Sequence, residues 1–131
     1  MYLERFTLYI QSYQKKIKEK YRLVVKLIRD LTTKKQLLSP DQYAVVKTDT
    51  LKKIRTLSDE CGYVSGLIND SFQNSKHTFQ SRFKAQMKLI FPLITAIRND
   101  LDIVHTLLSY EHIYQELIES KQGEDQYFMK S

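Results

Sequence analysis

The chain contains little glycine and little proline. Among its 131 residues there are 3 Gly and 2 Pro. Both residues interrupt helices and form tight turns, so their scarcity argues against many short elements and favours long helices. Long helices leave few loops, and loops are where catalytic side chains usually converge. The composition therefore favours a binding protein over an enzyme.

Cysteine and long apolar runs are also scarce. Cys61 is the only cysteine, which excludes an internal disulfide and fits a reducing compartment. The longest apolar run, at residues 89–94, is too short to span a bilayer. The N-terminal residues carry Glu4 and Arg5 and lack the apolar core of a signal peptide. We expect a cytoplasmic protein without a membrane-spanning segment.

The sequence lacks the common signatures of catalysis and metal binding. It has no glycine-rich phosphate loop, no His-Glu-x-x-His, no Cys-x-x-Cys and no Gly-x-Ser-x-Gly. A polar strip, formed by Asp102, His105, Ser109, His112 and Glu116, is its nearest approach to a metal site. His105 and His112 would lie two helical turns apart, about 10 Å, so a shared ion would need ligands from elsewhere. We predict no catalytic residue, no cofactor and no metal.

Charge is distributed unevenly along the chain. The net charge is +6, but residues 1–56 carry 14 Lys/Arg against 5 Asp/Glu, and residues 57–131 carry 7 against 10. One interpretation is a basic helix that faces acidic helices within a bundle. The other is attraction to nucleic acid, a membrane surface or another acidic partner. A candidate basic face on the first helix consists of Lys15, Lys18, Arg22, Lys26 and Arg29.

An apolar stripe predicts a first helix over residues 2–38. Its members follow one another at steps of three or four residues, which place them on one helical face. The two successive steps of four on either side of Ile17 depart from a heptad repeat, so a bundle is favoured over a long ideal coiled coil. The stripe consists of Leu3, Phe6, Ile10, Tyr13, Ile17, Tyr21, Val24, Ile28 and Leu31.

The clearest boundary is at residues 39–42. Ser39 can cap a helix, Pro40 suits its first position, and Gln42 completes a capping box. These residues predict a second helix over 40–72. Within it, Ser58, Gly62 and Gly66 recur every four residues, which predicts close packing against a neighbouring helix or, alternatively, a groove or a point of flexibility.

A third helix is expected over about residues 76–121, kinked or divided at Pro92. Residues 123–131 read as a flexible tail, which leaves one domain over 1–122. The predicted fold is all-α, an elongated antiparallel bundle of three long helices, or four if Pro92 divides the last.

The last helix has two apolar faces. Its first stripe runs from Phe83 to Leu108, and a second stripe lies roughly 140° away. A three-helix bundle readily buries one such face, so the second is interpreted either as additional core or as a surface for a partner helix, from a client or a second copy of the chain. This second stripe, the candidate partner-binding site, consists of Ile103, Leu107, Tyr110, Tyr114 and Leu117.

Several segments resemble the FlgN-type flagellar export chaperones. They are Lys34–Leu38, the break at Ser39–Asp41, Leu51–Ile54 with Leu57, Ile94–Asn99, and the pair Leu107 and Leu108. That family often has Asn-Gly before the paired apolar residues of its last helix, where this chain has Val104 and His105. The resemblance implies a cytosolic chaperone that holds the C-terminal amphipathic helix of a hook-filament junction protein before type III export.

Two other functions are considered. The basic face indicates a module that binds nucleic acid or another acidic partner. The segment His105–Ser109 resembles the His-Thr-Leu-Lys-Gly core of histidine phosphotransfer domains. Leu108 and Ser109 stand where that core has Lys and Gly, and few residues follow for the remaining helices.

Overall fold

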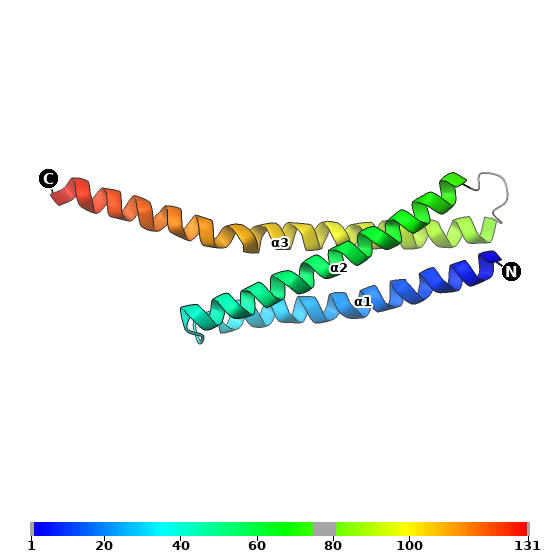
Figure 1. Cartoon of the computed structure of the whole chain (residues 1–131), viewed down its shortest axis with the longest axis horizontal. Coiled ribbons are helices and arrows are strands. Elements are labelled where there is room, and N and C mark those ends of the chain that lie inside the picture. The colour runs from blue at the N-terminus through cyan, green and yellow to red at the C-terminus, as the bar shows by residue number, and fades with distance from the viewer. Residues whose placement is uncertain (1, 75–80, 131) are drawn as a thin grey trace.

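The described residues form three long helices, each antiparallel to the one before it, so that α1 and α3 run in the same direction (Figure 1). This computed structural model describes the backbone of residues 2–74 and 81–130, and the side chains of residues 5–73, 84–111 and 120. The helices are α1 (Tyr2–Lys34), α2 (Pro40–Asn74) and α3 (Ser81–Lys130). Neither described segment contains a β-strand. The predicted all-α bundle is confirmed.

The capping box at the start of α2 forms as its residue types predict. The backbone N–H of Gln42 donates to the Ser39 hydroxyl at 3.2 Å, and the backbone N–H of Ser39 donates to the Gln42 side-chain carbonyl at 3.2 Å. Two N–H groups that the helix cannot satisfy internally thus find partners. Pro40 occupies the first helical position, where its missing N–H has no consequence.

The expected end of the first helix at residue 38 is wrong. The helix ends at Lys34, and a turn follows in which the backbone N–H groups of Leu37 and Leu38 both donate to the Lys34 carbonyl. Because Ser39 already caps α2, a helix to residue 38 would have left no residues to reverse the chain. The second helix ends two residues beyond the expected 72, within the usual uncertainty of helix ends.

The core follows the apolar stripes predicted for the first and last helices. In α1 its fully enclosed members recur every seven residues, at Ile10, Ile17, Val24 and Leu31. Phe6, Tyr13, Tyr21 and Ile28 flank them and are partly buried. The buried apolar residues of the other two helices are Ile54, Leu57, Cys61, Val64, Ile68, Met87, Ile90, Ile94, Ile97 and Leu101.

The third helix differs most from expectation. It passes through Pro92 as one continuous helix, and Figure 1 shows a gradual curve along it in place of a division. Pro92 is exposed, so water can bond to the carbonyl that the proline ring leaves without an N–H partner. The helix also continues to Lys130 and does not end near 121. The expected start at 76 lies outside the described residues.

The length of α3 gives the molecule its shape. It has 50 residues, whereas α1 has 33 and α2 has 35. The additional length lies at the C-terminal end, where α3 extends past the α1–α2 turn as a single helix in Figure 1. This part, residues 112–130, is called the α3 extension below. At 1.5 Å per residue its ~19 residues span about 28 Å.

Candidate functional site

The second stripe of α3 lies on the surface wherever the structure describes it. Ile103 is 58% exposed, Leu107 67% and Tyr110 60%, while Leu101 on the core face is only 2% exposed. The bundle thus buries one face of this helix and leaves the other in water. Tyr114 and Leu117, the remaining members, lie outside the described side chains.

Leu89 extends this exposed apolar face toward the start of α3 and was missed in the sequence. It is 76% exposed, and it lies 18 residues, five helical turns, before Leu107 on the same side of the helix. The sequence does contain the 18-residue spacing that places Leu89 on the face of Leu107. Asp100 obscured this pattern, because it interrupts the apolar face between Leu89 and Ile103.

Glu111 lies where α3 leaves the bundle, and it explains why the first stripe loses its apolar character there. Its carboxylate accepts a hydrogen bond from Lys35 of the α1–α2 turn and another, at 2.9 Å, from the Tyr43 hydroxyl. The Lys47 ammonium lies 3.4 Å away. Burial alone would raise the pKa of Glu111, but these donors and the two ammonium charges outweigh it and hold the pKa below its ordinary value.

These contacts change the environment of Tyr43 as well. Burial, together with the hydrogen bond to Glu111, raises the pKa of Tyr43 to about 12, because both disfavour a phenolate beside a carboxylate. The phenol therefore stays protonated and keeps donating at neutral pH. Glu111 joins the turn, α2 and α3 at one point, so the base of the α3 extension is held in place.

Two members of the predicted polar strip, Asp102 and His105, lie in a seam between α2 and α3. The Ser58 hydroxyl donates to the Asp102 carboxylate at 2.5 Å, and Ser109 lies 3.4 Å from Nδ1 of His105. A polar cavity of about 230 Å³ opens beside them, and it is also lined by Arg55, Asp59 and Arg98. Two arginines thus face two aspartates, which balances the charge of the cavity.

The described members of the strip, Asp102, His105 and Ser109, do not gather the ligands of a metal ion. Within residues 5–73, 84–111 and 120, no group of three His, Cys, Asp or Glu side chains is placed to hold one. His105 is half-buried, whereas a histidine phosphotransfer domain presents its histidine at the surface. His112 and Glu116 lie outside the described side chains.

The strip of small residues on α2 has different surroundings at each position. A Cβ atom added at Gly62 would lie 2.9 Å from Cζ of Arg98, so the Arg98 guanidinium lies directly over this glycine. At Gly66 an added Cβ would meet nothing within 4 Å. Close packing therefore occurs at Gly62, against a side chain of α3, while the space beside Gly66 is open.

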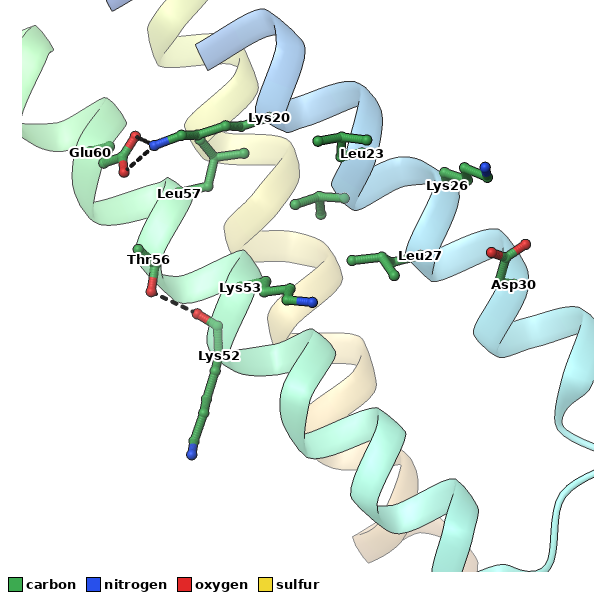
Figure 2. Close-up of a pocket in the computed structure, with 11 residues that line it drawn as sticks. Lys20, Leu23, Lys26, Leu27, Asp30, Lys52, Lys53, Thr56, Leu57 and Glu60 are labelled. Carbon is green, nitrogen blue, oxygen red and sulfur yellow. Dashed lines mark hydrogen bonds and ion pairs between the residues drawn. The ribbon is translucent and has the colours of Figure 1, made fainter. Parts of the chain in front are cut away.

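The seam between α1 and α2 is open on the side away from α3. A groove of about 610 Å³ lies there, and Figure 2 shows α3 passing behind it. Leu23, Leu27 and Leu57 line the groove, and Leu23 is 62% exposed. Lysines from both helices surround these apolar side chains. They are Lys20, Lys26, Lys52 and Lys53.

A second hollow of about 560 Å³ continues this seam toward the start of α1. The two hollows share Lys20, Thr56 and Glu60. Lys20 and Glu60 form an ion pair at 2.7 Å where the hollows meet. Tyr13 and Tyr63 line the second hollow, with their ring centres 6.3 Å apart. Together the two hollows are called the α1–α2 seam below.

The sequence contained a weak signal for this seam. Tyr9, Leu23 and Leu27 lie on one side of the main stripe of α1, next to its member Tyr13, but Lys16 and Lys20 separate the two tyrosines from the two leucines. All members of the candidate basic face are exposed. They are Lys15, Lys18, Arg22, Lys26 and Arg29, of which Lys26 also borders the seam.

Comparison with known proteins adds no assignment. No family model, curated protein or solved structure matches this chain. A search of the described helices finds none that is both long and apolar enough to cross a membrane.

Proposed function

We propose that this chain is a non-enzymatic protein that binds an amphipathic helix of a client along the second stripe of α3. The observation that supports this most directly is the exposure of Ile103, Leu107 and Tyr110 on a helix whose other apolar face packs into the core through Leu101, Val104 and Leu108. Fully burying a side chain of this size is worth roughly 1.5–3 kcal/mol. More than half of that stabilisation is unrealised at each position, and a partner helix would realise it.

The chemistry of the second stripe suits a helical partner. Its residues are spaced four, three, four and three positions apart, which matches the spacing of the apolar residues on an amphipathic helix. Tyr110 combines a broad apolar ring with a polar tip, a combination that is enriched in protein interfaces. The part of the stripe from Ile103 to Tyr110 lies on the packed bundle, so a client would find a rigid platform there.

The resemblance to FlgN-type export chaperones supplies a specific client. On that proposal the partner is the C-terminal amphipathic helix of a hook-filament junction protein, held in the cytoplasm before type III export. The probe is a fluorescein-labelled peptide of that helix from the source organism, and the measurement is its anisotropy as the chain is added. Saturable binding supports the flagellar role, and its absence removes it.

Variants of the second stripe test the surface itself. We expect Leu107→Asp combined with Tyr110→Asp to abolish peptide binding while far-UV circular dichroism and the melting temperature stay close to those of the parent. Leu8→Asp is the matched control, because Leu8 is similarly exposed at 64% but lies on α1. Peptide binding that survives the double substitution would contradict the proposal.

A second candidate function rests on the exposure of the whole basic face. Exposed lysine and arginine side chains along one helix can contact phosphates, and such binding weakens steeply with salt. Changing Lys15, Lys18, Arg22 and Arg29 to Gln tests it, because these positions oppose the core. If the protein binds a duplex DNA or RNA probe in a strongly salt-dependent way, and these substitutions remove that binding, the nucleic-acid function replaces the chaperone function.

A further inference from the structure

The α1–α2 seam has the dimensions of a site for a fourth helix. Its lining on α1 runs from Tyr13 to Asp30, which is about 26 Å at 1.5 Å per residue. Because α3 covers only the opposite side of the α1–α2 pair, a helix in the seam would complete a four-helix arrangement. That arrangement would cover Leu23 and Tyr63, which are 62% and 55% exposed.

The α3 extension has the matching length and leaves its own bundle. It spans about 28 Å, and in Figure 1 it passes the α1–α2 turn with neither α1 nor α2 beside it. Isolated helices of this length are marginal in water unless an apolar face is packed. The sequence supplies such a face at Tyr114 and Leu117, so the extension needs a partner surface.

Charge is complementary between the two. The seam is bordered by Lys16, Lys20, Lys26, Lys52 and Lys53, against Asp30, Asp59 and Glu60. The extension carries four acidic residues, Glu116, Glu119, Glu124 and Asp125, against two lysines. At 100° per residue, Glu124 and Asp125 lie on either side of the apolar stripe, within about 55° of its centre, and Lys121 lies near that centre. Glu116 and Glu119 lie on the other side of the helix. If the stripe faced the seam, Glu124 and Asp125 would meet its lysines, and Asp30 and Asp59 would offer partners for Lys121.

We propose that the α1–α2 seam of one copy holds the α3 extension of a second copy, and that the exchange is reciprocal. It rests on the proposed function in one respect, because the apolar contacts come from the part of the second stripe that lies on the extension. The portion on the bundle, Ile103 to Tyr110, stays available for a client. Two equivalent seams filled in this way form a closed, two-fold symmetric dimer.

The first test is the mass of the full-length chain. Multi-angle light scattering after gel filtration, over a range of loading concentrations, is expected to give twice 15.6 kDa. Leu23→Asp combined with Leu27→Asp should return the monomer, while Leu8→Asp, at a position of similar exposure that lines neither hollow, should remain a dimer. A monomeric parent chain, or a dimer that survives the substitutions in the seam, overturns the proposal.

Charge-reversal variants show whether a monomeric seam variant has lost the interface or has lost the fold. Lys26→Glu with Lys52→Glu, both exposed positions, should weaken the dimer at least tenfold, and so should Glu124→Lys with Asp125→Lys. Mixing the two variants should restore association, because each contributes one compatible seam and extension. If the mixture stays monomeric while the parent chain is a dimer, the seam is not the site.

The two proposals fail separately. A monomeric chain that still binds the client peptide overturns the exchange of extensions and leaves the proposed function standing. The opposite result is a dimer that both charge variants weaken, while the Leu107→Asp, Tyr110→Asp double variant still binds the peptide. That result supports the exchange of extensions and removes the proposed client surface.

Discussion

Two leucines on opposite faces of α3 should differ sharply in their contribution to stability. Leu101 is 2% exposed and Leu107 is 67% exposed. Replacing a buried leucine with alanine costs about 2–5 kcal/mol, because the transfer free energy is lost and a cavity is left. At Leu107 only about a third of the side chain is removed from water, so about a third of the usual 1.5–3 kcal/mol, roughly 0.5–1 kcal/mol, is at stake.

Leu101→Ala and Leu107→Ala therefore form a matched pair, with the same substitution at two positions six residues apart in one helix. The slightly higher helix propensity of alanine applies equally to both. Urea unfolding followed by far-UV circular dichroism, at a concentration where the chain is monomeric, measures the difference. We expect a gap of more than 1 kcal/mol in the free energy of unfolding, with similar m values. Equal losses of 2 kcal/mol or more would show that the second stripe belongs to the core of the monomer.

Three further predictions concern single residues. The pKa of Glu111 is lower in the folded chain than its ordinary value of 4.5, so its contacts stabilise the fold at pH values above 4.5, and this stabilisation is lost as the pH falls from there through the lowered pKa. Glu111→Gln should flatten the acidic part of the curve of melting temperature against pH, and an unchanged curve would contradict the assignment. Burial raises the pKa of Cys61 to about 11, so iodoacetamide at pH 8 should modify it slowly in the folded chain and rapidly in urea. Gly66→Ala should raise the free energy of unfolding by about 0.5–1 kcal/mol, whereas Gly62→Ala should gain less because Arg98 must move.

The core was predictable because a helix repeats a simple period. Every described member of the α1 stripe is at least partly buried, and the capping box at Ser39 and Gln42 forms as its residue types require. These features depend on residues a few positions apart, which a sequence displays directly.

Features that depend on distant residues were not predictable in the same way. The seam requires Leu23 of α1 and Leu57 of α2 to line one hollow, and no local pattern places them together. The polar residue Glu111 reads as the end of an apolar stripe, although Lys35, Tyr43 and Lys47 surround it in the fold. The continuation of α3 to Lys130 was also missed, since Gly123 indicates a helix end when only local propensity is considered.

The seven-residue spacing of Ile10, Ile17, Val24 and Leu31 has a consequence for the alignment of α1 against the other helices. Sliding α1 by seven residues, roughly 10 Å, would replace each core side chain with another branched aliphatic one. The apolar contacts alone would then tolerate more than one register.

Polar contacts between helices distinguish these registers. Lys20 lies 2.7 Å from Glu60, and the Tyr21 hydroxyl donates to Asp100 at 3.4 Å. After a shift of seven residues, Leu27 or Tyr13 would replace Lys20 opposite Glu60, and neither could form the ion pair. Exposed pairs of this kind add little to stability, but here they select one alignment among several that the core accepts.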